Sequence, residues 1–425
     1  MSHRRDLTIL LGAALWGLGG CGEPAGNELG DQVGAAVGDE AGTADIDWEG
    51  YLALGLQLSE GARYTEAIEY YEKARKLRPS DPRIHYNLAN AHFRREDFLR
   101  AVEAYGRTLE LDPDYAAALY NFASLNIRQQ KFEEALLLLE RALAADPDYA
   151  LAHMAMGQLL FRQGEYDKAA GEYSRAVEIE PGLTEAHYHL GELHAKRNDY
   201  EAAEAAYRKV IVLDAESARA RGGLGYVLLK RKRFREAADV LEEALSIDPR
   251  NTRAHFNLGN SYLRLGEREK GQKALARFSK LKEIDKKIAN LRVNLLQHPD
   301  DPWIYYSLGV LYGQRREYDK ARLRYQQAIA RDSSFVRAYN NLANTYLRDQ
   351  QLERAMALFR RATALDSTYA VAYNGLGNSL LLSRQPAEAE VAFSRACRLD
   401  SGNAEFLRNR GTARRMLADM EGRTQ

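Results

Sequence analysis

The sequence predicts an all-α fold, a right-handed superhelical solenoid of about ten helix-turn-helix repeats closed by a C-terminal capping helix. Three observations predict it. From Trp48 onward the sequence resembles itself at a fixed period of 34 residues. Within each period apolar residues recur three and four positions apart, as in amphipathic helices. Small residues and helix-ending prolines also recur at fixed positions of the period.

The composition excludes several classes of protein. With 60 basic and 60 acidic residues, the chain has no overall attraction for nucleic acid, and we expect no nucleic-acid partner. The two cysteines, Cys21 and Cys397, cannot form a disulfide framework or a four-cysteine metal site. Stability must therefore come from packing, and we expect no cofactor.

Residues 1–20 have the layout of a secretory signal, because basic residues precede an apolar stretch from Leu7 to Leu18. The next residues complete Leu18-Gly19-Gly20-Cys21, which resembles the lipobox of bacterial lipoproteins. The resemblance implies that Cys21 carries lipid and begins the mature protein. It also implies that Gly22 favours the outer membrane, with the chain facing the periplasm. The alternatives are a plain secretory signal or an uncleaved helix with an incidental cysteine.

Residues 21–47 follow as a tether. The segment after Cys21 holds seven acidic residues and no lysine or arginine, and is rich in Gly and Ala. Such a composition buries too little apolar surface to order itself, so we expect a flexible chain that sets the reach from the membrane.

The repeats begin at Trp48. The stretch "YLALGLQLSEGARYTEAIEYYEKARKLRP" from Tyr51 aligns without a gap with "HMAMGQLLFRQGEYDKAAGEYSRAVEIEP" from His153. The period and the pattern of aromatic, Leu-Gly, Ala, aromatic, Ala and Pro resemble the tetratricopeptide repeat. Seven copies form a first block, 48–285: 48–81, 82–115, 116–149, 150–183, 184–217, 218–251 and 252–285. Three copies form a second block, 302–403: 302–335, 336–369 and 370–403.

Position 8 of each repeat, counted from its first residue, is Gly or Ala, and so is position 20 on the second helix. Glycine within a helix costs about 1 kcal/mol relative to alanine, so its recurrence indicates a close crossing of the two helices. Repeats end at Pro or, in the second block, at Asp-Ser, as in Asp332-Ser333. We expect the proline to stop the second helix and the Asp and Ser to cap the next one.

Regularity fails once, after the seventh copy starts. The stretch 286–301 continues the helical pattern, and the eighth copy begins 16 residues late. We interpret it as a helical extension or hinge around 271–301 between the two blocks. Residues 404–425 resemble a first helix without a second, which suits a solvated cap and tail.

Partner binding is expected on the first helices, because in this family side chains at positions 2, 5, 6, 9, 12 and 13 commonly face a concave groove. Asparagines recur there and resemble the asparagine ladder of eukaryotic O-linked N-acetylglucosamine transferases, interrupted at Ala155, His189, Gly223, Ser307 and Gly375. A carboxamide can donate to and accept from a peptide backbone, although the same residues also suit packing between repeats. The candidates are Asn87, Asn90, Asn121, Asn257, Asn260, Asn340, Asn341, Asn344, Asn374 and Asn378, with the aromatic residues Tyr86, Tyr120 and Tyr188.

Catalytic signals are missing from the sequence. It has no phosphate-binding glycine-rich loop and no nucleophile elbow. For the histidines His187, His189 and His194 we expect packing with one ring nitrogen bonded, and no metal. Cys397 is expected to be a buried small hydrophobe. The basic stretch Lys230 to Arg235 and the row at position 13 are expected to be solvated or to sit favourably at helix C-termini.

The sequence therefore predicts a non-enzymatic scaffold, lipid-anchored in the cell envelope, that binds other proteins in its groove. It is similar to repeat lipoproteins that assist pilus secretins, outer-membrane assembly or polysaccharide export. The alternatives are an adaptor subunit that regulates an envelope enzyme, such as a peptidoglycan hydrolase or protease, and direct binding of polysaccharide.

Overall fold

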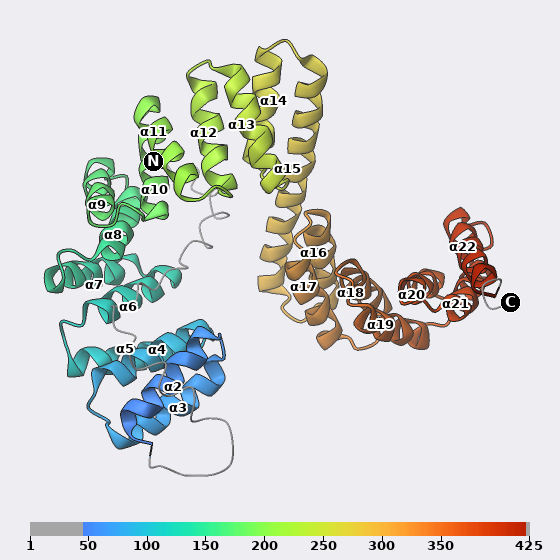
Figure 1. Ribbon diagram of the computed structural model, residues 1–425, viewed down its shortest axis with the longest axis horizontal. Coiled ribbons are helices and arrows are strands. Elements are labelled where there is room, and N and C mark those ends of the chain that lie inside the picture. The colour runs from blue at the N-terminus through green and yellow to red at the C-terminus, as the bar shows by residue number, and fades with distance from the viewer. Residues whose placement is uncertain (1–45, 422–425) are drawn as a thin grey trace, which may run out of the picture. The chain divides into compact units, whose positions relative to one another are not determined.

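The computed structural model describes residues 46–421, and every regular element in that part of the chain is an α-helix (Figure 1). The helices come in pairs joined by short turns, and one unpaired helix ends the series. This confirms the predicted all-α fold of paired repeats with an odd final helix. The chain divides into two compact units, Met1–Val240 and Leu241–Gln425.

Each first helix begins at the residue that starts a sequence repeat. The first helices are α2 (Trp48–Glu60), α4 (Pro82–Arg94), α6 (Ala116–Arg128), α8 (Ala150–Gln163), α10 (Thr184–Lys196), α12 (Ala218–Lys230), α14 (Thr252–Arg264), α16 (Pro302–Gln314), α18 (Val336–Arg348) and α20 (Ala370–Leu382). The second helices are α3 (Tyr64–Leu77), α5 (Phe98–Leu111), α7 (Phe132–Ala145), α9 (Tyr166–Ile179), α11 (Tyr200–Leu213), α13 (Phe234–Ile247), α15 (Arg268–Gln297), α17 (Tyr318–Arg331), α19 (Leu352–Leu365) and α21 (Pro386–Leu399), and α22 (Ala404–Glu421) is unpaired.

The helix crossing inside a repeat is close because an aromatic ring of the second helix lies over the glycine of the first. A Cβ placed on Gly157 would lie 2.7 Å from the ring of Tyr173, and one on Gly377 would lie 2.6 Å from the ring of Phe393. Ala169, at position 20, is fully buried as expected. The sequence predicted a contact between small residues, but the obstacle to a larger residue at these two glycines is the ring.

The turn between the two helices of a repeat requires one residue in the left-handed region. Glycine fills this position twice, at Gly164 and Gly266. The other eight repeats place a side chain there: Ala62, Glu96, Gln130, Asn198, Lys232, Arg316, Gln350 and Arg384. A backbone hydrogen bond across the helix end stabilises this conformation. In the second repeat, for example, Asp97 N donates to His92 O at 3.0 Å.

The expected capping of a first helix by Asp-Ser is wrong. Asp332 accepts hydrogen bonds from the amide and the hydroxyl of Ser334, at 2.9 and 2.6 Å, and so closes a turn before the helix. The N-cap of α18 is Phe335, whose side chain makes no cap hydrogen bond. Asp and Ser still stop the preceding helix, because the carboxylate offers the chain an alternative to helical hydrogen bonding.

The irregular region of the sequence is a single 30-residue helix, α15, within the second unit. Its buried residues include Ile284 and Ile288, which lie past Leu281, the position where a regular second helix would end. At the end of the series, α22 buries Phe406 and Ala413. Cys397 is 5% exposed, as the sequence predicted.

Candidate functional site

Two of the asparagines at position 6, Asn121 and Asn341, join neighbouring repeats. Asn121 Nδ2 donates to Tyr86 Oη at 2.9 Å and to Asn90 Oδ1 at 3.0 Å, although both acceptors belong to the preceding repeat. Tyr105 Oη donates to the same Asn90 oxygen at 2.6 Å. The side-chain amide of Asn121 therefore donates within the protein, and its Oδ1 is the atom left to accept a hydrogen bond from a partner.

The second unit repeats the arrangement. Asn341 Nδ2 donates to Tyr306 Oη at 3.2 Å, and Asn409 Nδ2 donates to Asn374 Oδ1 at 2.9 Å, each across one repeat. Asn340 is 3% exposed and donates to Asn341 Oδ1 at 3.1 Å. Positions 5 and 6 thus form a chain of side-chain hydrogen bonds between first helices, which stabilises the stacking of repeats.

Two other candidate asparagines are turned away from a partner. Asn87 Nδ2 donates to the carbonyl of Arg83 in its own helix at 2.8 Å. Asn257 is 4% exposed, and its Nδ2 has no hydrogen-bond partner among the described residues. Tyr120 is also buried and packs edge-on against Tyr149, with ring centroids 5.3 Å apart.

Position 9 of the second unit differs. Asn344 is exposed, and Asn260 and Asn378 are half-buried. Within residues 46–421 none of the three carboxamides is engaged by another side chain or by the backbone. Among the predicted site residues, these three retain both donors and acceptors for a partner.

A charged cluster lies on first helices of the first unit, on α10 and its neighbours α8 and α12. His189 Nε2 accepts from Gln158 at 2.8 Å, and its Nδ1 donates to Glu192 at 3.2 Å. Tyr188 Oη donates to Glu192 at 3.0 Å, while Arg219 lies 4.1 Å from the Tyr188 ring centroid. Burial alone would raise the pKa of Glu192, but the hydrogen bonds from His189 and Tyr188 outweigh it and the pKa is lowered.

Histidines at position 4 bind the end of the preceding repeat. The sequence predicted packing with one ring nitrogen bonded, and the structure gives the acceptor. In each case ring Nε2 donates to the carbonyl of the proline six residues earlier: His85 to Pro79, His153 to Pro147, His187 to Pro181 and His255 to Pro249. Within the described residues no three His, Cys, Asp or Glu side chains are grouped to hold a metal ion.

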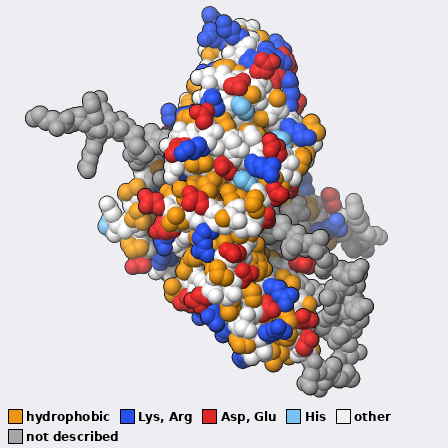
Figure 2. Space-filling model, turned by 90° about the vertical axis from the view of Figure 1, so that its left-hand side faces the viewer, with side chains coloured by type: hydrophobic (Ala, Val, Ile, Leu, Met, Phe, Trp, Pro, Cys, Tyr) orange, Lys and Arg blue, Asp and Glu red, His pale blue; other side chains and the backbone are white. Residues whose placement is uncertain are grey.

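The basic row at position 13 also has a structural role that its helix position did not reveal. Arg162 lies 4.2 Å from the Phe132 ring centroid and Arg348 lies 4.1 Å from that of Tyr318, both on the preceding repeat. These cation–π contacts link repeats and reduce the charge free for a ligand. On the face shown in Figure 2, acidic and basic side chains are interspersed.

Half of the basic stretch after Lys230 pairs with a buried acid. Glu204 of α11 is 3% exposed and is bonded by Arg231 and Arg233 from the turn after α12, with the Arg233 contact at 2.7 Å. Arg208 of the same helix adds a third ion pair. Burial raises the pKa of Glu204, but the arginines outweigh it, so its pKa is lowered. The stretch is therefore less basic than its sequence suggests.

We expect Glu204→Gln to destabilise the protein by about 1 to 3 kcal/mol at neutral pH, because it removes charge-assisted bonds at a buried site. A lowered folded-state pKa contributes stability above the unfolded pKa, about 4.3 for glutamate, and loses it as pH falls through the folded value. The difference in melting temperature between wild type and variant should therefore shrink below pH ~4. Glu133→Gln, at an exposed site, is the control, and an equal loss in both variants would refute the role of burial.

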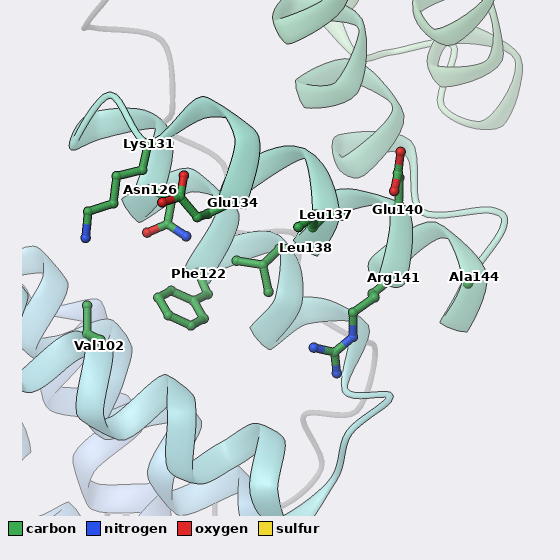
Figure 3. Close-up of a pocket in the computed structure, with 10 residues that line it drawn as sticks. All are labelled: Val102, Phe122, Asn126, Lys131, Glu134, Leu137, Leu138, Glu140, Arg141 and Ala144. Carbon is green, nitrogen blue, oxygen red and sulfur yellow. The ribbon is translucent and has the colours of Figure 1, made fainter.

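A cleft of about 740 Å³ lies in the first unit (Figure 3). Its walls come from α5, α6 and α7, with Phe122, Leu137 and Leu138 as the apolar part and Lys131 and Arg141 among the charged residues. Sequence reasoning did not find it, since it is set by the spacing of second helices and has no motif. None of the predicted partner-binding residues lines it.

The predicted lipidation site, Cys21, lies outside the described residues, as does the signal segment 1–20. Within residues 46–421, no helix has the length and apolar content to cross a membrane.

Comparisons with known proteins bear on the repeats. Solved structures similar in part include PilF of Pseudomonas aeruginosa (19% identity, 49% of this chain and 94% of that chain, TM-score 0.46) and YrrB, described as a TPR protein with an unusual peptide-binding site (25%, 43% and 95%, TM-score 0.38). MamA of Desulfovibrio magneticus RS-1 has 23% identity over 41% of this chain and 99% of that chain, with TM-score 0.36.

No curated protein sequence matches the chain. A family model described as tetratricopeptide repeat matches residues 52–116, 86–148, 120–184, 188–252 and 306–370, and a second model with the same description matches 228–295. These matches cover more than half of the chain and follow the paired helices described above. The chain therefore belongs to the tetratricopeptide repeat family of protein-binding scaffolds.

Proposed function

We propose that this protein is a non-enzymatic scaffold, anchored by lipid in a bacterial cell envelope, that holds extended segments of partner proteins on its first helices. Its role would be in envelope complex assembly, secretion, or export of pili or polysaccharide. Family membership supports the scaffold, and the lipobox ending at Cys21 supports the anchor.

The observation that carries the binding proposal is the difference between positions 6 and 9. The side-chain amides of Asn121 and Asn341 donate hydrogen bonds to the preceding repeat. Asn344 and Asn378, one repeat apart at position 9, form no side-chain hydrogen bond within the described chain. A carboxamide with free donor and acceptor groups can bind both the C=O and the N–H of an extended backbone, with little dependence on its sequence. We therefore place the partner along position 9 of the second unit.

The lipid would fix where this surface works. The pattern at Leu18 to Cys21 supports diacylation of the cysteine, and Gly22 supports retention at the outer membrane facing the periplasm. The acidic segment up to residue 47 would then set the distance between the bilayer and the first repeat.

The test is site-specific photocrosslinking in cells, with a photoreactive amino acid in place of Asn344. We expect discrete crosslinks to polypeptides from this position. Asn294, exposed on α15 of the same unit but not on a first helix, is the matched control and should give few. Equal crosslinking at the two positions would contradict the proposed surface.

The second arm is affinity. We expect Asn344→Ala with Asn378→Ala to weaken capture of the crosslinked partner about tenfold, because each lost hydrogen bond is worth roughly 0.5 to 1.5 kcal/mol. The melting temperature should not change, since neither side chain bonds within the described protein. Asn290→Ala with Asn294→Ala is the control pair. Unchanged affinity in the Asn344→Ala, Asn378→Ala variant would mean that these asparagines contact solvent and do not bind the partner.

A further inference from the structure

The final helix, α22, stands in the register of a first helix, but within residues 46–421 no second helix follows it (Figure 1). Its buried residues Phe406 and Ala413 pack against the preceding repeat, with Cys397 and Phe393 among their neighbours. A regular first helix such as α20 ends after 13 residues and the chain turns back, whereas α22 continues for 18 residues. One side of α22 therefore lacks the helix that covers a first helix in the complete repeats.

Position 8 of α22 is Gly411, and its surroundings differ from those of position 8 elsewhere. In all ten complete repeats the residue at position 8 is buried. A Cβ built on Gly309 would lie 2.5 Å from the ring of Tyr325, at position 24 of the second helix. Gly411 is half-buried, and a Cβ built on it would meet no described atom within 4 Å. The space that an aromatic ring fills in the other repeats is thus open here.

The side of α22 around Gly411 is exposed and basic. Between residues 407 and 418, six residues lie within about 60° of Gly411 around the helix axis, since each residue turns the helix by about 100°. They include three arginines and no acid, and all except Gly411 are exposed. We call them the open face: Leu407, Arg408, Gly411, Arg414, Arg415 and Ala418. Phe406 and Ala413 lie on the opposite side, so packing fixes the rotation of the open face toward solvent.

Two of the three arginines have no acidic partner. Arg414 Nε donates to Glu390 Oε1 of α21 at 2.9 Å. The side chain of Arg408 forms no hydrogen bond or ion pair with a described residue, and that of Arg415 bonds the Thr412 hydroxyl alone, at 3.4 Å. Arg408 and Arg415 are on the same flank of Gly411, whereas Arg414 is on the other. The open face therefore has one flank of unpaired positive charge beside the space over Gly411.

The complete repeats show what kind of helix fits this side of a first helix. In α9, Ala169, Tyr173 and Ala176 are each at most 1% exposed, so small residues stand four before and three after the ring. The two helices of a repeat are antiparallel, because a short turn joins them. In such a pair the residues three before and four after the ring lie on the flank that meets positions 12 and 5 of the first helix. On α22 these two positions are Arg415 and Arg408.

We propose that an acidic amphipathic helix of a partner protein docks antiparallel on the open face, in the place that a second helix takes in a complete repeat. Its aromatic ring would lie on Gly411, and carboxylates three residues before and four residues after the ring would pair with Arg415 and Arg408. A buried aromatic ring supplies the anchor, and the arginine–carboxylate pairs fix the direction of the helix. This surface is separate from position 9 and goes beyond the proposed function.

The probe is a fluorescent peptide with the sequence of α9, Tyr166–Ile179, that carries the proposed features. Ala170→Glu and Val177→Glu supply the two carboxylates, and Gly171→Ala strengthens the isolated helix. We expect the full chain without its signal and with Cys21→Ser to bind this peptide saturably in fluorescence anisotropy. The peptide without its ring, with Tyr173→Ala added, should bind at least about tenfold more weakly. Absence of saturable binding, or equal binding of the two peptides, would overturn the proposal.

Gly411→Leu tests the location of the ring. The leucine would fill the open space without displacing a described atom, and it favours a helix more than glycine does, so α22 should stay folded. We expect this variant to bind the peptide at least about tenfold more weakly. The matched control is Gly106→Leu on α5, because Gly106 is also a helical glycine with no described atom near its Cβ position. Equal affinity of the two variants would place the peptide elsewhere on the protein.

Charge reversal tests the flank. Arg408→Glu with Arg415→Glu should weaken binding at least about tenfold, and a peptide with lysine in place of both added glutamates should restore it. The control pair is Arg253→Glu with Arg361→Glu, two exposed arginines of α14 and α19, which should bind as the parent does. Equal losses in the two pairs would contradict the proposal, because binding would then follow net charge alone. Circular dichroism would verify that all variants are folded.

Sedimentation velocity tests the other occupant of this surface, a second copy of the chain. We expect Gly411→Leu to leave the sedimentation coefficient unchanged. A dimer that this change dissociates would overturn the proposal in favour of self-association through α22. None of these measurements involves Asn344, so failure of this proposal is distinguishable from failure of the scaffold proposal.

Discussion

Phe359→Ala is expected to lower the stability of the second unit by about 3 to 5 kcal/mol, the usual cost of removing a fully buried aromatic ring. Phe359 of α19 is 0% exposed and packs with Ala343, Ala355 and Ala372. The ring also fills the space where Gly375 lacks a Cβ, so its loss opens a cavity between two repeats. Its buried neighbours Ala343, Ala355 and Ala372 have side chains too short to fill the gap.

The loss should be local, because each repeat of such an array contacts mainly its neighbours. Amide hydrogen exchange is the suitable measurement, since it reports stability element by element. Protection should fall in α18, α19 and α20 and remain unchanged in α4 to α6. Leu323→Ala in the same unit is the control, because Leu323 is 50% exposed. If both variants lost the same protection, burial of the Phe359 ring would not be what stabilises the contact between these repeats.

The sequence predicted the helices well because the period is imposed by packing. A second helix must return to the same depth in every repeat, so Tyr173, Phe359 and their equivalents recur at one position. The conformation of the turn between the two helices of a repeat was harder to predict from the sequence. Its left-handed residue is glycine at Gly164 and Gly266 but a side chain elsewhere, because hydrogen bonds across the helix end hold it there.

The sequence predicted which positions carry the candidate side chains, but not which other side chains they form hydrogen bonds with. Asn121 and Asn344 both recur in the sequence as first-helix asparagines, yet one is bonded to Tyr86 and the other is exposed. The difference depends on a tyrosine 35 residues earlier in the chain, which the local pattern does not reveal. Glu204 is a similar case, because two of its three arginines come from the turn of the following repeat.

Cys21→Ser is expected to move the protein from the membrane fraction to the soluble fraction after a high-salt wash. A thiol carries the lipid in lipoproteins, and a serine hydroxyl at that position is not a substrate for the same transfer. Acyl chains contribute about 0.8 kcal/mol per buried methylene, so several chains hold a protein that one chain would not. Membrane fractionation with immunodetection measures the change.

The chain offers a matched control in its second cysteine. Cys397 is buried at 5% exposure beside Phe406, so Cys397→Ser leaves the anchor intact and should remain in the membrane fraction. Retention of Cys21→Ser after the high-salt wash would contradict the anchor, because electrostatic contact alone does not survive such screening.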